Sequence, residues 1–455
     1  MTLLAFLIAL GLLVTIHEWG HYRMALWCGV RVLRFSIGFG RPLWRWTRRD
    51  ARSGHDIEFV VGWLPLGGYV KLLDEEEGEV PEAERHLAFS AQPLSRRAAI
   101  VFAGPLANLV LAVLLYSLQF AWGQWQTQAV LAAPLPGSVA EVAGVRSGDT
   151  LVRAARVGDA RWTDLPSWEA FRWWLLSLDE DTPIRLALAS GCEVELVPPT
   201  DPSPDEARYG LVMPERYGLV APRSTAQLRE VLPDSAAQRA GLRAGDVVLR
   251  IDDEPIEDAG VLRRRIRAAG TDVATPREAV WHITRHGEPM TVMVQLDVLS
   301  EGEQRVGRLG ALIGAPPERV WVQSHGWAVW GDALQRTWDV AWMNLESLWR
   351  MLTAQTSWQQ LGGPLAIAEG AGRSLEVGIV AYVGFLALLS TSLGVFNLLP
   401  IPALDGGRLM YYLWELFMGH PPAGRWLHLY QQAGLMALFF LMAVAVFNDL
   451  NRWVG

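Results

Sequence analysis

The longest apolar runs in the chain lie at residues 1–27, 98–122, 376–400 and 427–448. Each is close to the roughly 20 residues that a helix needs to cross the hydrocarbon core of a bilayer. The first run has no positively charged start and no small-residue cleavage site behind it, which favours a membrane span over a signal peptide. The pattern therefore predicts a multi-pass α-helical membrane protein with four transmembrane helices.

Between the first two runs, residues 58–72 read EFVVGWLPLGGYVKL. Apolar residues alternate on both sides of a Pro-Leu-Gly-Gly break, which is typical of a β-hairpin. The segment is too short to cross a bilayer twice and too apolar for a free loop. We interpret it as a re-entrant β-hairpin within the loop of residues 28–97, at a depth where protein or a water-filled cavity must satisfy its backbone.

The long stretch after the second run contains an internal repeat. PGSVAEVAGVRSGDTLVRA begins at Pro136, and PDSAAQRAGLRAGDVVLRI begins at Pro233. The domain-sized offset is too long for a solenoid repeat. Each copy predicts a short helix, a Gly-Asp turn and a β-strand, with further strand patterns behind it. We expect two β-rich domains, at residues 126–219 and 220–315; a β-rich spacer that binds no ligand is the alternative.

Two connecting segments complete the plan. Residues 316–375 carry an apolar stripe at helical spacing with several tryptophans, which predicts an amphipathic juxtamembrane segment at the outer membrane boundary. Residues 401–426 are expected to form a catalytic turn, Leu404-Asp405-Gly406, and a cytoplasmic loop before the last span.

The distribution of positively charged residues predicts how the chain is oriented in the membrane. Arginines concentrate in residues 28–97, so the positive-inside rule predicts that this loop is cytoplasmic and that both β-rich domains are outside. Hydrophobic residues make up 51% of the chain and charged residues 19%, which fits a few spans joined to aqueous domains. The net charge of −8 argues against a nucleic-acid partner.

Catalytic chemistry is indicated by HEWGH inside the first span. Residues four apart share a helix face, so His17 and His21 can give two imidazole nitrogens to one metal ion. Glu18 lies on the adjoining face and can reach an attacking water as a general base. Ionisable residues are costly inside a membrane and mark functional sites there. The motif therefore predicts a zinc-dependent hydrolase within the bilayer.

The third zinc ligand must come from elsewhere, because no further histidine follows the motif at the spacing of metzincins. The best candidate is Asp405, in the sequence NLLPIPALDGG that starts at Asn397. Pro400 and Pro402 stop the preceding helix, and the glycines permit a tight turn. The Asn397 amide can hold a substrate backbone or stabilise an oxyanion. A helix-capping role for Asp405 is the alternative.

Several motifs in order resemble the site-2 protease family of intramembrane zinc metalloproteases, in particular its Gram-negative bacterial members with tandem PDZ domains. They are HEWGH, FSIGFG from Phe35, PLGGYVKLLDE from Pro65, GPLAN from Gly104, GPLAIAEGAG and NLLPIPALDGG. The resemblance covers essentially the whole chain and is weakest in the first repeat copy and at residues 327–360. The two copies resemble circularly permuted PDZ domains.

The resemblance implies a role for each matching residue. Zn²⁺ is bound by His17, His21 and Asp405, and Glu18 activates the water. The substrate-binding residues are Asn397, Pro400, Pro402, Gly67, Gly68 and Tyr69, of which the last three belong to an edge strand that receives an unwound substrate.

The resemblance also implies a cellular role. The chain is expected in the bacterial inner membrane, with periplasmic PDZ domains and an active site that opens towards the cytoplasm. Its substrates are expected to be single-pass membrane proteins: an anti-sigma factor after a first cleavage, in the sigma-E envelope stress response, and remnant signal peptides. The PDZ pair is expected to bind peptide C-termini or to exclude substrates with bulky outer domains.

Two other functions remain open on the sequence. A non-catalytic PDZ membrane scaffold with a structural metal site requires Glu18 to be dispensable, because Glu18 ligates nothing. A metal transporter requires ionisable residues along a path through the other spans, and the sequence has no such array.

Overall fold

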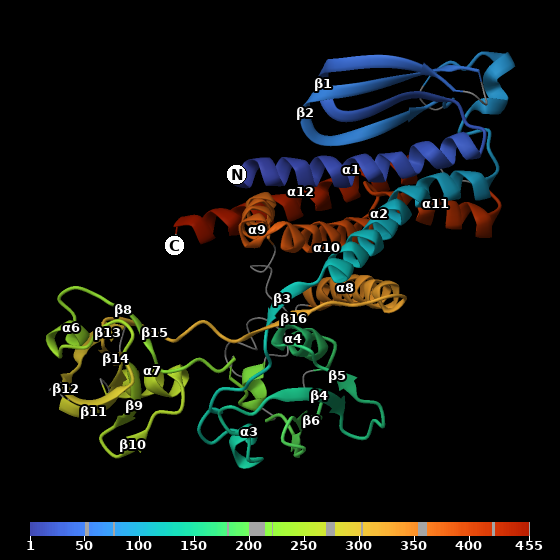
Figure 1. Ribbon diagram of the computed structural model, residues 1–455. Helices are drawn as coiled ribbons and strands as arrows, with labels where there is room; N and C mark the ends of the chain where they lie inside the picture. The colour runs from blue at the N-terminus through green and yellow to red at the C-terminus, as the bar shows by residue number, and fades with distance from the viewer. Residues whose placement is uncertain are drawn as a thin grey trace. The chain divides into compact units, whose positions relative to one another are not determined.

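The computed structural model describes residues 1–50, 54–75, 78–179, 182–199, 214–220, 222–269, 278–301, 304–353, 362–420 and 424–454. The chain forms two compact units (Figure 1). Unit 1 comprises Met1–Gln124 and Gln323–Gly455, and unit 2 comprises Trp125–Val322.

Unit 1 is built on long apolar helices. Among the described residues, four helices are long and apolar enough to cross a membrane, as the sequence predicts. They are α1 (Thr2–Trp27), α2 (Leu94–Trp122), α10 (Ile379–Asn397) and α12 (Gly424–Val454), the last with its apolar window at Gln432–Asn451.

Small residues let these helices approach closely, as is usual in membranes. A Cβ added to Gly20 of α1 would overlap the Ala103 carbonyl of α2, and one added to Gly394 of α10 would lie 3.1 Å from the Pro105 carbonyl oxygen of α2. The Ser390 hydroxyl of α10 donates a 2.8 Å hydrogen bond to the Asn108 carbonyl. Helix α2 is therefore the element against which α1 and α10 are both fixed.

A sheet of two long strands, β1 (Val32–Arg49) and β2 (Asp56–Leu72), lies along α1 (Figure 1). Both strands bend, and Arg34 of β1 pairs with Glu58 and also with Lys71 of β2. Residues 32–37 therefore lie between residues 58–61 and residues 68–72. Within the described pairings, residues 68–72 have a neighbour on one side only and form an edge.

The predicted hairpin within residues 58–72 is wrong in its pairing. The two halves of this segment do not pair with each other in the described register; residues 32–37 are inserted between them. Val32 and Phe35 are both buried in this central segment. Burial of these side chains favours the inserted strand, and the alternation within residues 58–72 could not reveal it because the inserted strand lies outside that segment.

Four further elements complete unit 1. They are η1 (Glu82–Leu87), α8 (Ala328–Leu352), α9 (Pro364–Val377) and α11 (Asp405–Met418). Helix α8 is two-faced: Ala333 and Val340 are fully buried, whereas Trp330, Trp338 and Trp342 are exposed. A row of exposed tryptophans matches the amphipathic stripe predicted for this part of the chain.

Unit 2 contains two four-stranded sheets of the same plan. The first has the order β5-β4-β6-β7, from Thr163–Asp164, Leu151–Arg156, Ile184–Leu188 and Glu193–Leu196, with helices α3 (Val139–Val142) and α4 (Trp168–Leu176). The second has the order β10-β9-β11-β12, from Glu254–Pro255, Val247–Ile251, Glu278–Arg285 and Glu288–Gln295, with helices α6 (Ala236–Arg239) and α7 (Ala259–Ala268). The matching order of elements agrees with the internal repeat.

Shorter elements pair around these sheets. The pairs are β3 (Gln124–Thr127) with β16 (Arg319–Val322), β8 (Leu228–Val231) with β15 (Ala311–Ile313), and β13 (Asp297–Glu301) with β14 (Gln304–Arg308). A 3-10 turn, η2 (Pro214–Tyr217), lies between β7 and β8 in the sequence.

The repeated Gly-Asp has the same structural task in both copies. The Asp149 carboxylate accepts a 2.8 Å hydrogen bond from the Arg146 backbone N–H, and Asp246 accepts one of the same length from Arg243. Asp246 is fully buried and also pairs with Arg285 at 2.7 Å. Burial alone would raise the pKa of Asp246, but the hydrogen bonds from Arg285 and Arg243 lower it below its ordinary value.

A buried carboxylate joins the two copies. Asp258 caps α7 through a 2.9 Å hydrogen bond from the Val261 N–H. Its other oxygen accepts hydrogen bonds from the first copy, at 2.6 Å from the Ala133 N–H and at 2.9 Å from the Ser147 hydroxyl. A buried carboxylate is stable only with such partners. The side chain that begins α7 therefore also links the two copies.

Candidate metal centre and active site

Two histidines of α1 meet the first residue of α11. His17 and His21 lie one turn apart with their Nε2 atoms 3.2 Å from each other. The Asp405 Oδ2 lies 3.1 Å from the His17 Nε2 and 3.4 Å from the His21 Nε2. The three possible ligand atoms lie within 4.8 Å of one another, the one such group found in the described part of the chain. The three residues predicted from the sequence therefore converge in space.

The hydrogen bond at the far side of the His21 ring leaves its Nε2 free for a metal. The His21 Nδ1 lies 2.8 Å from the Ile100 carbonyl oxygen of α2. A carbonyl only accepts hydrogen bonds, so Nδ1 carries the proton and Nε2 presents a lone pair towards Asp405. This backbone contact is the usual way in which a protein orients a zinc-binding histidine.

Asn108 of α2 performs the corresponding task for His17. Asn108 is fully buried, its amide nitrogen lies 3.2 Å from the His17 Nδ1, and its Oδ1 has no hydrogen-bond partner. A 180° rotation of the amide exchanges the two atoms. The Oδ1 then accepts the proton of the His17 Nδ1, and the His17 Nε2 is free for the metal. No role for Asn108 followed from the sequence, although this residue ends the GPLAN motif.

We expect replacement of Asn108 by alanine to weaken zinc binding by about 10- to 100-fold, because the His17 ring loses the group that orients it. The measurement is a competition titration of the purified chain with a zinc chelator. Ser117→Ala is the matched control: Ser117 is also a buried polar residue of α2, but it touches neither histidine in any described hydrogen bond. Equal zinc affinities of Asn108→Ala and Ser117→Ala would contradict this role.

Gly104 of α2 provides the space that the imidazoles occupy. A Cβ built on Gly104 would overlap the His21 Nε2 and would lie 2.9 Å from the His17 Nε2. Any side chain at this position therefore competes with the two ligand atoms. The sequence contains the signal, because Gly104 opens GPLAN, but its purpose depends on α2 packing across α1.

The proposed base, Glu18, lies between the three candidate metal ligands and the edge of the sheet. The Val70 backbone N–H of β2 lies close enough to the Glu18 carboxylate to stabilise its charge. A Cβ added to Gly68 would lie 3.1 Å from the Glu18 Cγ and 2.7 Å from the Ser36 carbonyl oxygen, so a glycine is needed for this close approach. The edge formed by residues 68–72 therefore passes directly beside Glu18.

The neighbouring residues of the edge are held by side-chain contacts. The Tyr69 hydroxyl accepts a 3.2 Å hydrogen bond from Arg34, and its ring stacks on Phe39 with centroids 6.2 Å apart. Gly67 has a positive φ of 123°, a conformation that favours glycine. These contacts position the edge beside Glu18 and leave its outer backbone groups available.

The turn that carries Asp405 is tightly folded. Asn397 ends α10, and residues up to Leu404 connect it to α11. A Cβ on Gly406 would overlap the Leu399 carbonyl, and one on Gly407 would overlap the Ile401 carbonyl. Leu404 is the N-cap of α11 and no side chain caps the helix, so the alternative of a capping role for Asp405 does not describe this turn.

Pro402 of this turn lies beside the last apolar helix. A Cβ on Gly434 of α12 would lie 2.5 Å from the Pro402 ring, so the two pack closely. Asn397 is partly exposed and Pro400 is exposed. The proposed substrate-binding residues Asn397, Pro400 and Pro402 thus belong to the segment that immediately precedes Asp405.

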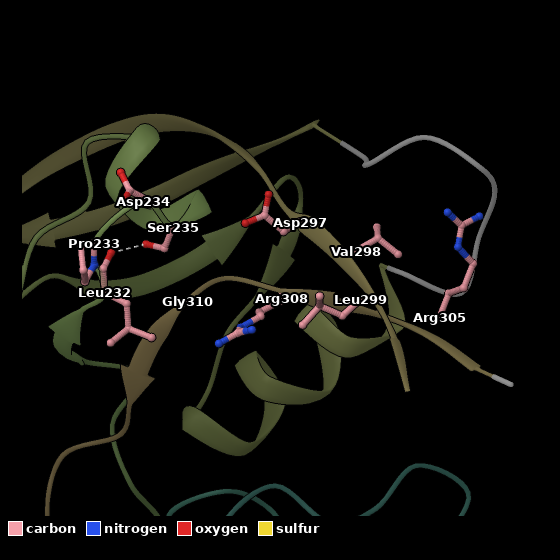
Figure 2. A pocket seen from close by; sticks show the side chains of 10 residues that line it. All are labelled: Leu232, Pro233, Asp234, Ser235, Asp297, Val298, Leu299, Arg305, Arg308 and Gly310. Atoms are coloured by element: carbon pink, nitrogen blue, oxygen red, sulfur yellow. Dashed lines mark hydrogen bonds between the residues drawn. The ribbon is translucent and has the colours of Figure 1, made fainter. Parts of the chain in front are cut away.

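Unit 2 has a cavity of its own, shown in Figure 2. Its volume is about 610 Å³, and it lies between the start of α6 and the strands β13 and β14. Its walls carry charges of both signs: Asp234, Asp297, Arg305 and Arg308. None of the residues predicted for catalysis lines it.

Comparison with known proteins gives the class. A family model described as peptidase family M50 matches residues 5–441. The chain therefore belongs to the M50 family, the site-2 protease family, and it is a zinc metalloprotease. The resemblance predicted from the motifs is confirmed.

Individual relatives match over the full length. Protease RseP of Yersinia pestis is 35% identical over 465 residues, which is 99% of this chain and 98% of the relative. The regulator of sigma-E protease RseP of Escherichia coli is 33% identical over 468 residues, with the same coverage of 99% and 98%. A Ralstonia nicotianae protein, described as a candidate zinc metalloprotease, is 36% identical over 466 residues, again with coverage of 99% and 98%.

Proposed function

We propose that this chain cleaves single-pass membrane proteins within their spans, with zinc held by His17, His21 and Asp405 and with Glu18 as the general base. The observation that carries the proposal is the convergence of three ligand atoms from α1 and α11 next to a second carboxylate, that of Glu18. Histidine and carboxylate ligands in this number suit a catalytic zinc, which keeps one position for water.

The donor set fits zinc by its chemistry. Two neutral imidazoles and one carboxylate are ligands of known zinc hydrolases, and the Asp405 Oδ2 is buried without a hydrogen-bond donor. Zinc at such a site polarises the substrate carbonyl and lowers the pKa of water. Glu18 then takes the proton from the attacking water and later delivers it to the departing amide nitrogen.

The edge formed by residues 68–72 is proposed to bind the substrate and to present it for cleavage. A helix hides its peptide bonds in its own hydrogen bonds, so a membrane-spanning substrate must unwind before hydrolysis. In the described pairings residues 68–72 have a neighbouring strand on one side only, and this edge lies beside Glu18. If the unwound segment adds to this edge as a strand, new hydrogen bonds replace those that its backbone lost, and its peptide bonds are aligned with Glu18. Asn397, Pro400 and Pro402 are proposed to contact the substrate on the side of Asp405.

The same proposal covers location and partners. It places the chain in the bacterial inner membrane, with the β1–β2 sheet entering the membrane from the cytoplasmic side and α8 at the outer boundary. The two repeat copies of unit 2 are proposed to be periplasmic PDZ domains that bind peptide C-termini and exclude bulky substrates. The name of the Escherichia coli relative, regulator of sigma-E protease, supports a role in sigma-E regulation. An anti-sigma factor is therefore the proposed substrate, and remnant signal peptides are a further proposed class.

Glu18→Gln tests catalysis separately from metal binding. We expect the variant to retain zinc and to cleave a single-pass test substrate without an outer domain about 10² to 10⁴ times more slowly, because the base is removed and the ligands remain. Glu369→Gln is the matched control, since Glu369 is an exposed carboxylate of α9 that pairs with Arg373 one turn away. The assay measures product by immunoblot and zinc by elemental analysis in the same preparations.

The non-catalytic scaffold gives the opposite result. If the site were structural, Glu18→Gln would leave every property of the chain unchanged, and the wild type would not cleave the substrate despite bound zinc. Equal cleavage by the wild type and Glu18→Gln would assign the activity to a contaminant and contradict the proposed base.

A further inference from the structure

A groove of about 820 Å³ runs between α1, α2 and the ends of β1 and β2. All of its lining residues belong to unit 1. One end of the groove is basic, and the wall that extends away from this end is apolar. A phospholipid is divided in the same way, into a charged headgroup and an apolar tail.

The basic end consists of Arg23 of α1 and Arg48 and Arg49 of β1. All three arginines are exposed, and the Arg23 guanidinium lies 5.9 Å above the Trp19 ring. One carboxylate, Asp50, lines the same end, so the balance of charge there is positive. Exposed guanidinium groups in this arrangement suit a phosphate.

The apolar wall follows α2 away from this end. Leu106, Val110 and Leu114 succeed one another at four-residue steps, line the groove and are exposed to it. Eleven residues separate Ala103 from Leu114 along the helix, a rise of about 16 Å. Half of the hydrocarbon core is about 15 Å thick, so the wall is as long as one leaflet.

Aromatic residues lie between the two parts. Trp19 and Tyr22 of α1 line the groove and come before Arg23 in the helix, on the side of the apolar wall, whereas Trp27 lines it beyond Arg23. Tryptophan and tyrosine prefer the boundary between headgroups and hydrocarbon. The order of arginines, aromatic residues and an aliphatic wall thus follows the polarity of one membrane leaflet.

The groove faces away from the catalytic residues. With 3.6 residues per turn, Trp19 lies about 160° around α1 from His21, and Ile16 lies about 160° from Glu18. A peptide in the groove would therefore face the wrong side of α1 for hydrolysis. This placement favours a lipid over a substrate segment.

We propose that this groove binds one anionic phospholipid, with its headgroup at Arg23, Arg48 and Arg49 and an acyl chain along Leu106, Val110 and Leu114. The bound lipid ties the end of β1 to α1 and so holds the sheet against the helix that carries His17 and His21. The proposal concerns α1 and α2 as membrane helices and does not depend on the substrate.

Native mass spectrometry of the full chain in a non-ionic detergent tests it, with phosphatidylglycerol and phosphatidylcholine titrated separately. We expect one phosphatidylglycerol to bind in clear preference to phosphatidylcholine. Arg23→Gln with Arg48→Gln should weaken phosphatidylglycerol binding about thirtyfold. Arg41→Gln with Arg45→Gln is the matched control, because both residues are exposed on β1, carry the same charge and do not line the groove; we expect less than a threefold change.

A second variant tests the tail. Val110→Trp fills the wall without changing charge and should also reduce phosphatidylglycerol binding. Unchanged zinc content of every variant verifies the fold. The proposal is overturned if the wild type binds both lipids equally, if the Arg41 and Arg45 control loses as much as the Arg23 and Arg48 variant, or if a substrate span displaces the lipid competitively.

Discussion

Replacement of Gly104 by alanine is expected to remove zinc from the chain and to reduce cleavage by a factor of about 10⁴ or more. The added Cβ would occupy the position of the His21 Nε2 and would lie 2.9 Å from the His17 Nε2. The His21 ring cannot turn away without losing its hydrogen bond to the Ile100 carbonyl. Both ligand atoms are therefore displaced by one methyl group that belongs to another helix.

The substitution separates metal binding from helix stability, because alanine is the better helix former by about 1 kcal/mol. Gly11→Ala is the matched control: it makes the same change within α1, and nothing lies within 4 Å of the added Cβ. Zinc content, cleavage rate and melting temperature are measured for both variants. Retention of zinc and activity by Gly104→Ala, at the level of Gly11→Ala, would show that the imidazoles do not need this space.

Excision of unit 2 is expected to change which substrates are cut. The Gln128 backbone N–H donates a 2.9 Å hydrogen bond to the Glu318 carbonyl, and β3 pairs with β16 beside them. A short glycine-containing turn in place of residues 129–317 can therefore close the two strands as a hairpin. If unit 2 excludes bulky substrates, the shortened chain should cleave a substrate with an intact outer domain that the wild type leaves uncut.

The same experiment contains its own control. A substrate without an outer domain should be cleaved at the same rate by both chains, which verifies that unit 1 folds and functions after the excision. Glu18→Gln in the shortened chain should abolish cleavage of both substrates. Continued exclusion of the intact substrate by an otherwise active shortened chain would contradict the role of unit 2 as a size filter.

The predictions of the four helices and of the internal repeat are supported, because both depend on short-range patterns in the sequence. The apolar runs specify helices at all four expected positions in the described chain, because length and hydrophobicity are local properties. The two Gly-Asp turns repeat one local hydrogen bond, at Asp149 and Asp246. The prediction that residues 58–72 form a hairpin is wrong, because both halves of this segment pair with residues 32–37. The sequence of a strand does not reveal which other strand it pairs with.

The sequence by itself determined that His17 and His21 share one face, since a spacing of four residues on a helix permits little else. Only the tertiary structure decided that Asp405 reaches the two histidines and that Gly104, which has no side chain, leaves room for their rings. It also decided that Ile100 and Asn108 orient these rings. These partners come from helices far apart in the chain. Their distances depend on how α1, α2 and α11 pack, and packing is a property of complementary surfaces that no single segment contains.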